Sequence, residues 1–219
     1  MSVEADEGTR RTIALAAPLD VVRTTEPLRH GPHDPSCRVV DGVVWRAWRS
    51  PAGPATIRLV THPDQVEATA WGEGAEAALD AVPSLIGCHD DSTDFDPQHP
   101  LVARLWRDFE AVRIPRSGAV TETLINVVLE QRVTTFEARR AQAQLVSRWS
   151  EPAPGLGDLM LPPDPEVMAG VAYYDLHVIG VERSRADTVR RVAASARRLE
   201  ALTLLPPAEA NSRLTSIVG

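Results

Sequence analysis

The hydrophobic pattern of this chain changes near residue 99, and no other feature restricts its possible folds as much. Up to residue 72, short runs of apolar and β-branched residues alternate with polar ones, which is typical of half-buried strands. From residue 99 onward, apolar residues recur every three or four positions, which is typical of amphipathic helices. Strands followed by a run of helices predict an α+β fold. We therefore expect an N-terminal α+β domain over residues 1–98 and a helical domain over residues 99–219.

The first part of the chain predicts a small antiparallel sheet. Asp41-Gly42 separates two runs that are rich in valine, which is a strong signal for a two-residue hairpin turn. Residues 11–17 form a short apolar run, and residues 56–62 and 65–72 continue the alternation, so three or four antiparallel strands fit this part of the sequence. Residues 74–87 are rich in alanine and end in glycine, which predicts a helix against one face of the sheet.

Composition restricts the compartment and the chemistry. No stretch approaches the roughly 20 apolar residues of a membrane helix, and the first residues are acidic and polar, so we expect a cytoplasmic protein with no membrane partner. The sequence contains no lysine, so no side-chain amine of this chain can form a Schiff base. Cys37 and Cys88 lie far apart without metal-type spacing, which predicts two unpaired thiols in a reducing compartment.

Charge is distributed unevenly along the chain. The net charge of −7 argues against binding to nucleic acid by overall attraction. Residues 1–100 hold 16 acidic residues and 8 arginines, whereas residues 101–219 hold 14 acidic residues and 15 arginines. A partner made of phosphate would therefore meet the second half of the chain.

The segment at residues 88–100 is polar and contains four aspartates and two histidines. Their spacing matches neither an EF-hand nor a zinc site. We interpret the segment as a solvated acidic linker, and we expect neither a metal nor a cofactor in this protein.

Three segments of the second half read TLINVVLEQRVTTFEARR, MAGVAYYDLHVIGVERSRADTVRRVA and RLTSIVG. In this order they resemble the helix-hairpin-helix DNA glycosylases, in particular the DNA-3-methyladenine glycosylase II branch. A helix that ends in Gln131 and is followed by Val-Thr and an alanine-containing helix is a feature of the family. The helix start from Gly180 to Ala186 is another. The resemblance implies a small curved antiparallel sheet domain followed by a helical domain of the glycosylase type.

The resemblance also implies a function in base-excision repair. Enzymes of this family flip a damaged base out of double-stranded DNA and hydrolyse its bond to the sugar, and the branch named above removes alkylated bases such as 3-methyladenine and 7-methylguanine. The expected partner is therefore duplex DNA with a damaged base. We expect a monomer that acts at the nucleoid of a bacterial cell.

The resemblance places a DNA contact in the turn Gln131-Arg132-Val133-Thr134. This turn matches the place where the family inserts a side chain into the gap left by the flipped base, and the inserted position falls on Arg132. In the closest branch that residue is apolar, so arginine is a departure. A guanidinium can still stack on bases and bond to the orphaned partner base. The alternative is a solvated cation at a helix C-terminus.

The end of the sequence matches the start of the family's hairpin. Leu214, Ile217 and Gly219 fit its pattern, and Gly219 would present its backbone N–H to a phosphate. The second hairpin glycine, the second helix and the catalytic aspartate of the family have no counterpart in these 219 residues. The resemblance therefore implies a glycosylase domain truncated at the hairpin and inactive alone, in which Leu214 and Ile217 lack a cover. The alternative is that the glycine simply ends a complete domain.

We assign no catalytic residue from the sequence. Asp175 and Asp187 lie where helix starts and exposed helix faces ordinarily carry acids. Tyr173 and Tyr174 are weak candidates for a base pocket, whereas the tryptophans of the first half fit core or groove packing. Ser184 is expected to cap a helix, with Asp187 three residues on, and either Thr134 or Thr135 is expected to cap another, with Glu137 near the capping-box position. Asp164 is expected to cap a third helix, with Pro165 at the first helical position.

Two other functions fit the residues. One is a non-catalytic DNA-binding or interaction module that keeps the scaffold without the chemistry. The other is an unrelated ligand-sensing α+β domain, which the acidic first half suits. Binding to duplex DNA that falls steeply with salt separates the first two functions from the third.

Overall fold

The computed structural model describes residues 7–156 and 158–218 and confirms the α+β fold. The chain divides into two compact units. The sheet unit consists of Met1–Arg29, Cys37–Ser117 and Pro154–Gly157, and the helical unit consists of His30–Ser36, Gly118–Ala153 and Asp158–Gly219. Residues 100–117 therefore belong with the sheet. The domains predicted at residues 1–98 and 99–219 stay a prediction, because compactness does not show which segments fold independently.

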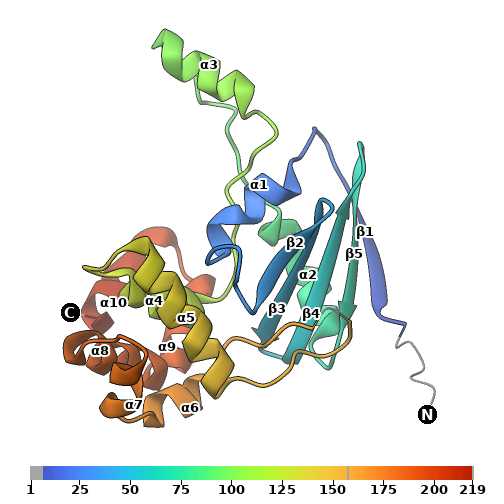
Figure 1. Cartoon of the computed structure of the whole chain (residues 1–219). Coiled ribbons are helices and arrows are strands. Elements are labelled where there is room, and N and C mark those ends of the chain that lie inside the picture. Colours follow the sequence, from blue (N-terminus) through green and yellow to red (C-terminus); the bar gives the residue numbers. More distant parts are fainter. Residues whose placement is uncertain (1–6, 157, 219) are drawn as a thin grey trace. The chain divides into compact units, whose positions relative to one another are not determined.

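The sheet of the first unit has five antiparallel strands within the described residues (Figure 1). They are β1 (Thr9–Ala14), β2 (Cys37–Val40), β3 (Val43–Ser50), β4 (Gly53–Thr61) and β5 (Gln65–Trp71). The order across the sheet is β1-β5-β4-β3-β2. Hairpins join β2 through β5 in sequence, whereas β1 pairs with β5 across a long connection, with Thr9 opposite Ala70. Strand β1 overlaps the apolar run at residues 11–17, and the sheet has one strand more than the three or four expected from the sequence.

The predicted hairpin turn at Asp41-Gly42 is confirmed. Both residues have positive φ angles, 50° and 76°. A two-residue turn of this kind requires a positive φ at both positions, and its twist matches that of the flanking strands. The turn therefore fixes the register of β2 against β3, with Val40 opposite Val43.

The two faces of the sheet carry different side chains. Helix α2 (Ala75–Leu85) covers one face, as the sequence predicts, and Leu79 and Val82 are fully buried there. Arg11 of β1 forms ion pairs with Glu76 and Asp80 of α2. On the other face Trp45 stacks on Trp71, with ring centroids 5.7 Å apart.

The remaining elements of the sheet unit are short helices. They are α1 (Val21–Thr25), the 3-10 helix η1 (Glu26–Leu28) and α3 (Pro100–Asp108). The acidic linker before α3 has structural contacts for three of its four aspartates. Asp90 accepts a hydrogen bond from Ile114 N (3.0 Å), Asp91 accepts two from Thr93, and Asp96 accepts one from Gln98. Among the residues that the structure describes, no three His, Cys, Asp or Glu side chains gather as metal ligands would.

The helical unit is built from short helices around one apolar core. They are α4 (Val120–Glu130), α5 (Thr135–Trp149), α6 (Pro165–Gly170), α7 (Tyr173–Val178), α8 (Arg183–Ala194), α9 (Ala196–Glu200), η2 (Ala201–Leu204) and α10 (Pro207–Val218). Leu129, Met168 and Val189 are fully buried or nearly so in this core.

The expectation that Leu214 lacks a cover is wrong. Its side chain is partly buried and packs against the helical core, because α10 contacts α8 and η2. The side chain of Ile217 and the whole of Gly219 lie outside the described residues.

Two further findings concern the cysteines and the hydrophobicity of the helices. Cys37 is buried and Cys88 is exposed, and within the described residues neither forms a disulfide. Over residues 7–156 and 158–218, no helix combines the length and the hydrophobicity that crossing a bilayer requires.

Candidate nucleic-acid interface

The turn between α4 and α5 has an uncommon backbone conformation at its centre. Helix α4 ends at Glu130, Gln131 is extended, and Arg132 has a φ angle of 57°. Residues with a Cβ atom rarely adopt this left-handed conformation, since the Cβ atom crowds the following carbonyl. The chain reverses within this turn, and both Gln131 and Arg132 are exposed.

A capping box holds the second half of the turn. The Thr134 hydroxyl accepts a hydrogen bond from Glu137 N (3.3 Å), and the Glu137 carboxylate accepts hydrogen bonds from Thr134 N (2.9 Å) and Thr134 Oγ1 (2.8 Å). These hydrogen bonds lower the pKa of Glu137, and the charge of Arg185 lowers it further. The cap predicted from the sequence at Thr134 is therefore confirmed, and it fixes where α5 begins.

A buried arginine holds the first half of the turn. Arg185 is only 6% exposed, and its guanidinium donates to the carbonyl of Leu129 (2.9 Å) and to that of Gly180 (3.0 Å). The Leu129 carbonyl belongs to the last turn of α4, where carbonyls lack partners within the helix. Arg185 therefore ties the end of α4 to the turn that precedes α8.

The other end of α4 is held by a carboxylate from a distant part of the sequence. Glu200 accepts hydrogen bonds from Val120 N (3.1 Å) and Thr121 N (2.8 Å). A negative charge at the start of a helix and a positive charge at its end both favour the helix dipole. The side chains of Glu200 and Arg185 thus bind the two ends of α4. The turn that follows α4 therefore begins at a helix end that is held in place.

A cavity of about 560 Å³ lies beside the turn. Its lining residues are Gln131, Arg132, Glu182, Ser184, Arg185 and Thr188. The lining is polar and carries both signs of charge. Such a surface can hydrogen-bond to a polar ligand from several directions.

The structure brings together some of the residues predicted from the sequence and separates others. Gln131 and Arg132 line the cavity, and Val133 and Thr134 complete the same turn. Tyr173 and Tyr174 do not line this cavity. Their assignment to a base pocket and the DNA contact at the turn both stay predictions, and Gly219 lies outside the described residues.

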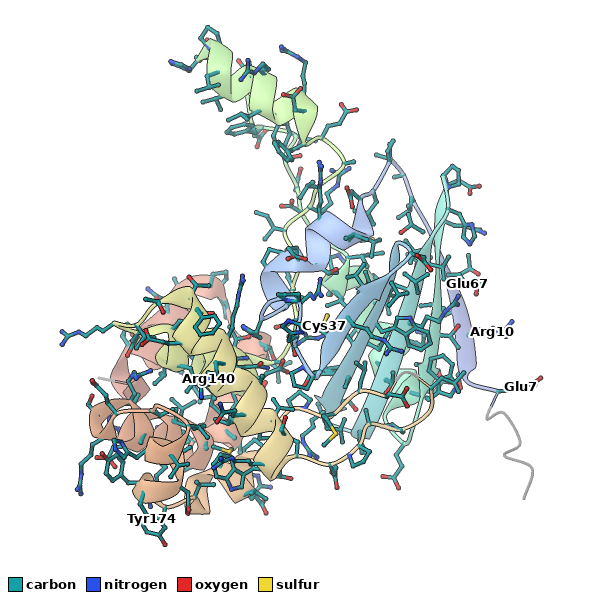
Figure 2. All side chains as sticks on the ribbon, in the orientation of Figure 1. Glu7, Arg10, Cys37, Glu67, Arg140 and Tyr174 are labelled. Carbon is teal, nitrogen blue, oxygen red and sulfur yellow. The ribbon has the colours of Figure 1, made fainter. Side chains whose placement is uncertain are left out.

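The two tyrosines of α7 have different surroundings. The Tyr173 hydroxyl lies 3.3 Å from His177 Nδ1, and the Arg183 guanidinium carbon lies 5.3 Å from the centre of the Tyr173 ring. Tyr174 is 70% exposed, and Figure 2 shows its side chain at the outer edge of α7. Tyr174 is thus the tyrosine whose ring is exposed to solvent.

Two aspartates of the helical unit, Asp187 and Asp164, have contacts that give them ordinary structural roles. Asp187 forms ion pairs with Arg183 (3.8 Å) and Arg190 (4.0 Å) on α8. Asp164 caps α6 by accepting a hydrogen bond from Glu166 N (2.7 Å), as predicted.

The predicted helix cap at Ser184 is wrong. Helix α8 begins at Arg183 with Glu182 at the cap position. Val181 is fully buried just before it, and Gly180 has a φ angle of 87°, so the chain turns and enters the helix before Ser184. A pattern of capping residues in the sequence does not show that Val181 is buried and that its burial sets where the helix begins.

The sequence did not indicate the roles of Arg185 and Glu200 or the exposure of Phe136. Arg185 falls within the motif from Gly180 to Ala186, but the motif does not reveal the carbonyls that it binds. The signal for Phe136 is an aromatic residue on the polar side of α5, where it is 75% exposed. Glu200 offers no local signal, because its partners lie 79 and 80 residues away.

Comparisons with known proteins point to one fold. No protein-family model matches this sequence, and a search of curated proteins finds no match. Among solved structures, 3-methyladenine DNA-glycosylase from Archaeoglobus fulgidus is similar with a TM-score of 0.77 at 19% identity, over 95% of this chain and 75% of that one.

Two further solved structures have the same fold. MBOgg1 in complex with a low-affinity DNA ligand gives a TM-score of 0.69 at 15% identity, over 97% of this chain and 72% of that one. The Clostridium acetobutylicum 8-oxoguanine glycosylase/lyase, in complex with double-stranded DNA containing cytosine opposite 8-oxoguanine, gives 0.66 at 10% identity, over 96% and 74%. The chain therefore has the fold of these DNA glycosylases.

Proposed function

We propose that this protein binds damaged duplex DNA in base-excision repair, and that the damage is an alkylated base such as 3-methyladenine or 7-methylguanine. The observation that carries the proposal is the turn at Arg132. An exposed guanidinium lies in a left-handed turn whose two flanking helix ends are held by Arg185 and by the Thr134 capping box. The fold shared with proteins named as DNA glycosylases supports this assignment.

The turn supplies what a flipped base requires. Removing a base from the stack leaves a gap, and the cost of unstacking amounts to a few kcal/mol. The Arg132 guanidinium is planar and rich in donors, so it fills the gap, stacks on the neighbouring bases and donates to the orphaned partner base. Because its backbone is fixed before DNA arrives, less conformational entropy is lost on binding.

The preference for alkylated bases rests on two observations. The motifs of the helical half resemble the 3-methyladenine branch, and one similar structure carries that name. Alkylated purines are cationic, and aromatic faces attract cations. Tyr173 and Tyr174 stay the candidates for that contact. The exposed ring of Tyr174 is more accessible to a base than the ring of Tyr173, which Arg183 covers.

A second candidate function is a non-catalytic DNA-binding module on the same scaffold. It is favoured by the acids of the helical unit, of which Asp187 and Glu200 are already engaged in structural contacts. We assign none of the described carboxylates to hydrolysis. The 219-residue chain is therefore expected to bind damaged DNA without releasing the base.

One set of measurements tests both functions. The probes are a methylated duplex, a duplex with a tetrahydrofuran abasic-site analogue, and the intact duplex. Arg132→Ala should weaken binding to the abasic duplex by at least about 5-fold, the lower limit for losing a stacking contact. Arg148→Ala, an exposed arginine at the other end of α5, is the matched control.

Three outcomes test the role of Arg132, the release of the base and the binding to DNA. Equal affinity of Arg132→Ala and the unchanged protein removes the role of Arg132. Release of 3-methyladenine above a no-protein control identifies a glycosylase and overturns the expected inactivity. Binding that does not fall with rising salt contradicts both functions, because phosphate contacts release counterions.

A further inference from the structure

Phe136 is an aromatic side chain that the helical unit leaves in solvent. It is the second residue of α5 and is 75% exposed. The buried residues of α5 are Ala138, Ala141, Gln142, Leu145 and Val146. With 3.6 residues per turn, Phe136 lies on the side of the helix opposite to these residues. Its exposure therefore follows from the register of α5 and is not a local distortion.

Two arginines flank Phe136 along the chain. Arg132 lies four residues before it, in the turn, and Arg140 lies four residues after it, one turn along the same exposed face of α5. Figure 2 labels Arg140 on α5. Arg132 and Arg140 are exposed, and neither side chain forms a hydrogen bond or an ion pair within residues 7–156 and 158–218. The Cα atoms of Arg132 and Phe136 are at most about 14 Å apart, since four residues span no more than that when extended.

This arrangement matches nucleic acid better than a protein surface. Protein partners cover contiguous apolar patches of several hundred Å², whereas Phe136 is a single ring between two unpaired cations. Phosphates complement the guanidiniums, and bases offer flat faces to the ring. Apolar wedges such as phenylalanine insert between base steps in proteins that kink DNA.

We propose that Phe136 is a second DNA contact, whose ring stacks on the base pair next to the gap filled by Arg132, while Arg140 binds a phosphate of the same strand. The proposal rests on the function proposed above and adds a residue to its interface. Arg132 enters the gap, Phe136 supports the step beside it, and Arg140 fixes the backbone one helical turn further on. Damaged DNA is favoured because the step beside a gap opens at lower cost than an intact step.

The test compares binding of the whole chain to the abasic-analogue duplex and to the intact duplex. Phe136→Ala should weaken binding to the abasic duplex by about 5- to 150-fold, the range for losing one base–aromatic stack. It should weaken binding to the intact duplex far less. Phe136→Trp should retain the affinity, because it keeps a flat ring. Arg140→Gln should weaken both duplexes alike and reduce the slope of log affinity against log salt by about 1.

A matched control and a second readout keep the outcome unambiguous. Leu204→Ala removes an apolar side chain that is 86% exposed in the same unit, and it should leave both affinities unchanged. A 2-aminopurine placed beside the abasic site should be quenched by the unchanged protein and not by Phe136→Ala. Thermal unfolding of Phe136→Ala should match that of the unchanged protein, since the ring is exposed.

The failures of the two proposals differ. If the unchanged protein binds neither duplex, the proposed function fails. If the unchanged protein prefers the abasic duplex and Phe136→Ala binds it equally well, only the role of Phe136 is overturned. An equal loss on both duplexes also overturns stacking beside the gap. A change in the sedimentation of the free protein on Phe136→Ala identifies a second copy as the partner instead.

Discussion

At Arg132 the backbone conformation lowers stability, whereas the side chain has the binding role that we propose. A φ angle of 57° costs a residue with a Cβ atom roughly 1–2 kcal/mol. Glycine adopts this conformation without that cost and is the usual residue after a helix end. The presence of arginine there is consistent with a side chain kept for binding at the expense of stability.

Arg132→Gly should therefore stabilise the protein and weaken its binding to DNA. The expected gain in the free energy of unfolding is about 1 kcal/mol, from relief of the left-handed conformation. Urea unfolding and binding to the abasic duplex measure the two effects. The matched variant Arg140→Gly lies inside α5 and should lose about 1 kcal/mol. A loss of stability in Arg132→Gly would contradict the interpretation.

Glu137 makes the start of α5 sensitive to pH. Its hydrogen bonds to Thr134 lower its pKa from the ordinary value of 4.5, so its contribution to stability is present above pH 4.5. The contribution is lost as the pH falls through the lowered pKa in the folded state. Glu137→Gln should remove this dependence, so the two proteins converge in stability at low pH. Hydrogen exchange of the first turn of α5 reports the effect, and parallel pH profiles would speak against it.

Among the elements, α4 depends on two charged side chains from other helices. Glu200 of α9 caps its first turn, and Arg185 of α8 binds a carbonyl of its last turn. The residue before α4, Ala119, provides no side-chain cap. A helix of 11 residues is marginal by itself in water. Helix α4 is therefore completed by tertiary contacts, and the turn that carries Arg132 inherits its position from them.

Arg185→Met should destabilise the helical unit and disturb the turn. The substitution keeps most of the apolar stem and leaves the carbonyls of Leu129 and Gly180 without their donor, at a cost of about 1–3 kcal/mol. Arg183→Met is the control, because that side chain is 75% exposed and exposed ion pairs contribute little. Thermal unfolding measures both. Equal melting temperatures for the two variants would refute the role assigned to Arg185.

At the scale of the whole molecule, each of the two compact units is built from three separate segments of the chain. His30–Ser36 comes from the N-terminal half and belongs to the helical unit, where Asp34 is buried. The Asp34 carboxylate accepts hydrogen bonds from His30 N (2.8 Å), Ser36 N (2.9 Å) and Gln142 Nε2 (3.4 Å). His30 also lies 3.7 Å from Glu130 at the end of α4. This segment therefore contacts both helices that flank the turn.

Asp34→Ala should destabilise the helical unit although Asp34 lies far from the rest of that unit in sequence. Loss of the buried carboxylate leaves buried donors unpaired and costs about 1–3 kcal/mol. Hydrogen exchange should rise in α5, where Gln142 loses its partner, and in the segment His30–Ser36. Asp64→Ala, at an exposed position of the sheet unit, is the control. Unchanged exchange in α5 would show that the segment does not support the helix.

Local patterns determined much of this protein. Alternation, the Asp41-Gly42 turn and the alanine-rich helix predicted the sheet and its covering helix, because each depends on neighbouring residues. The same holds for the capping box at Thr134 and for the cap at Asp164. Only the tertiary structure decided the pairing of β1 with β5, the start of α8 and the surroundings of Arg132, because β1, Arg185 and Glu200 meet partners many residues away. Interactions of that kind depend on the packing of whole elements, which no local pattern encodes.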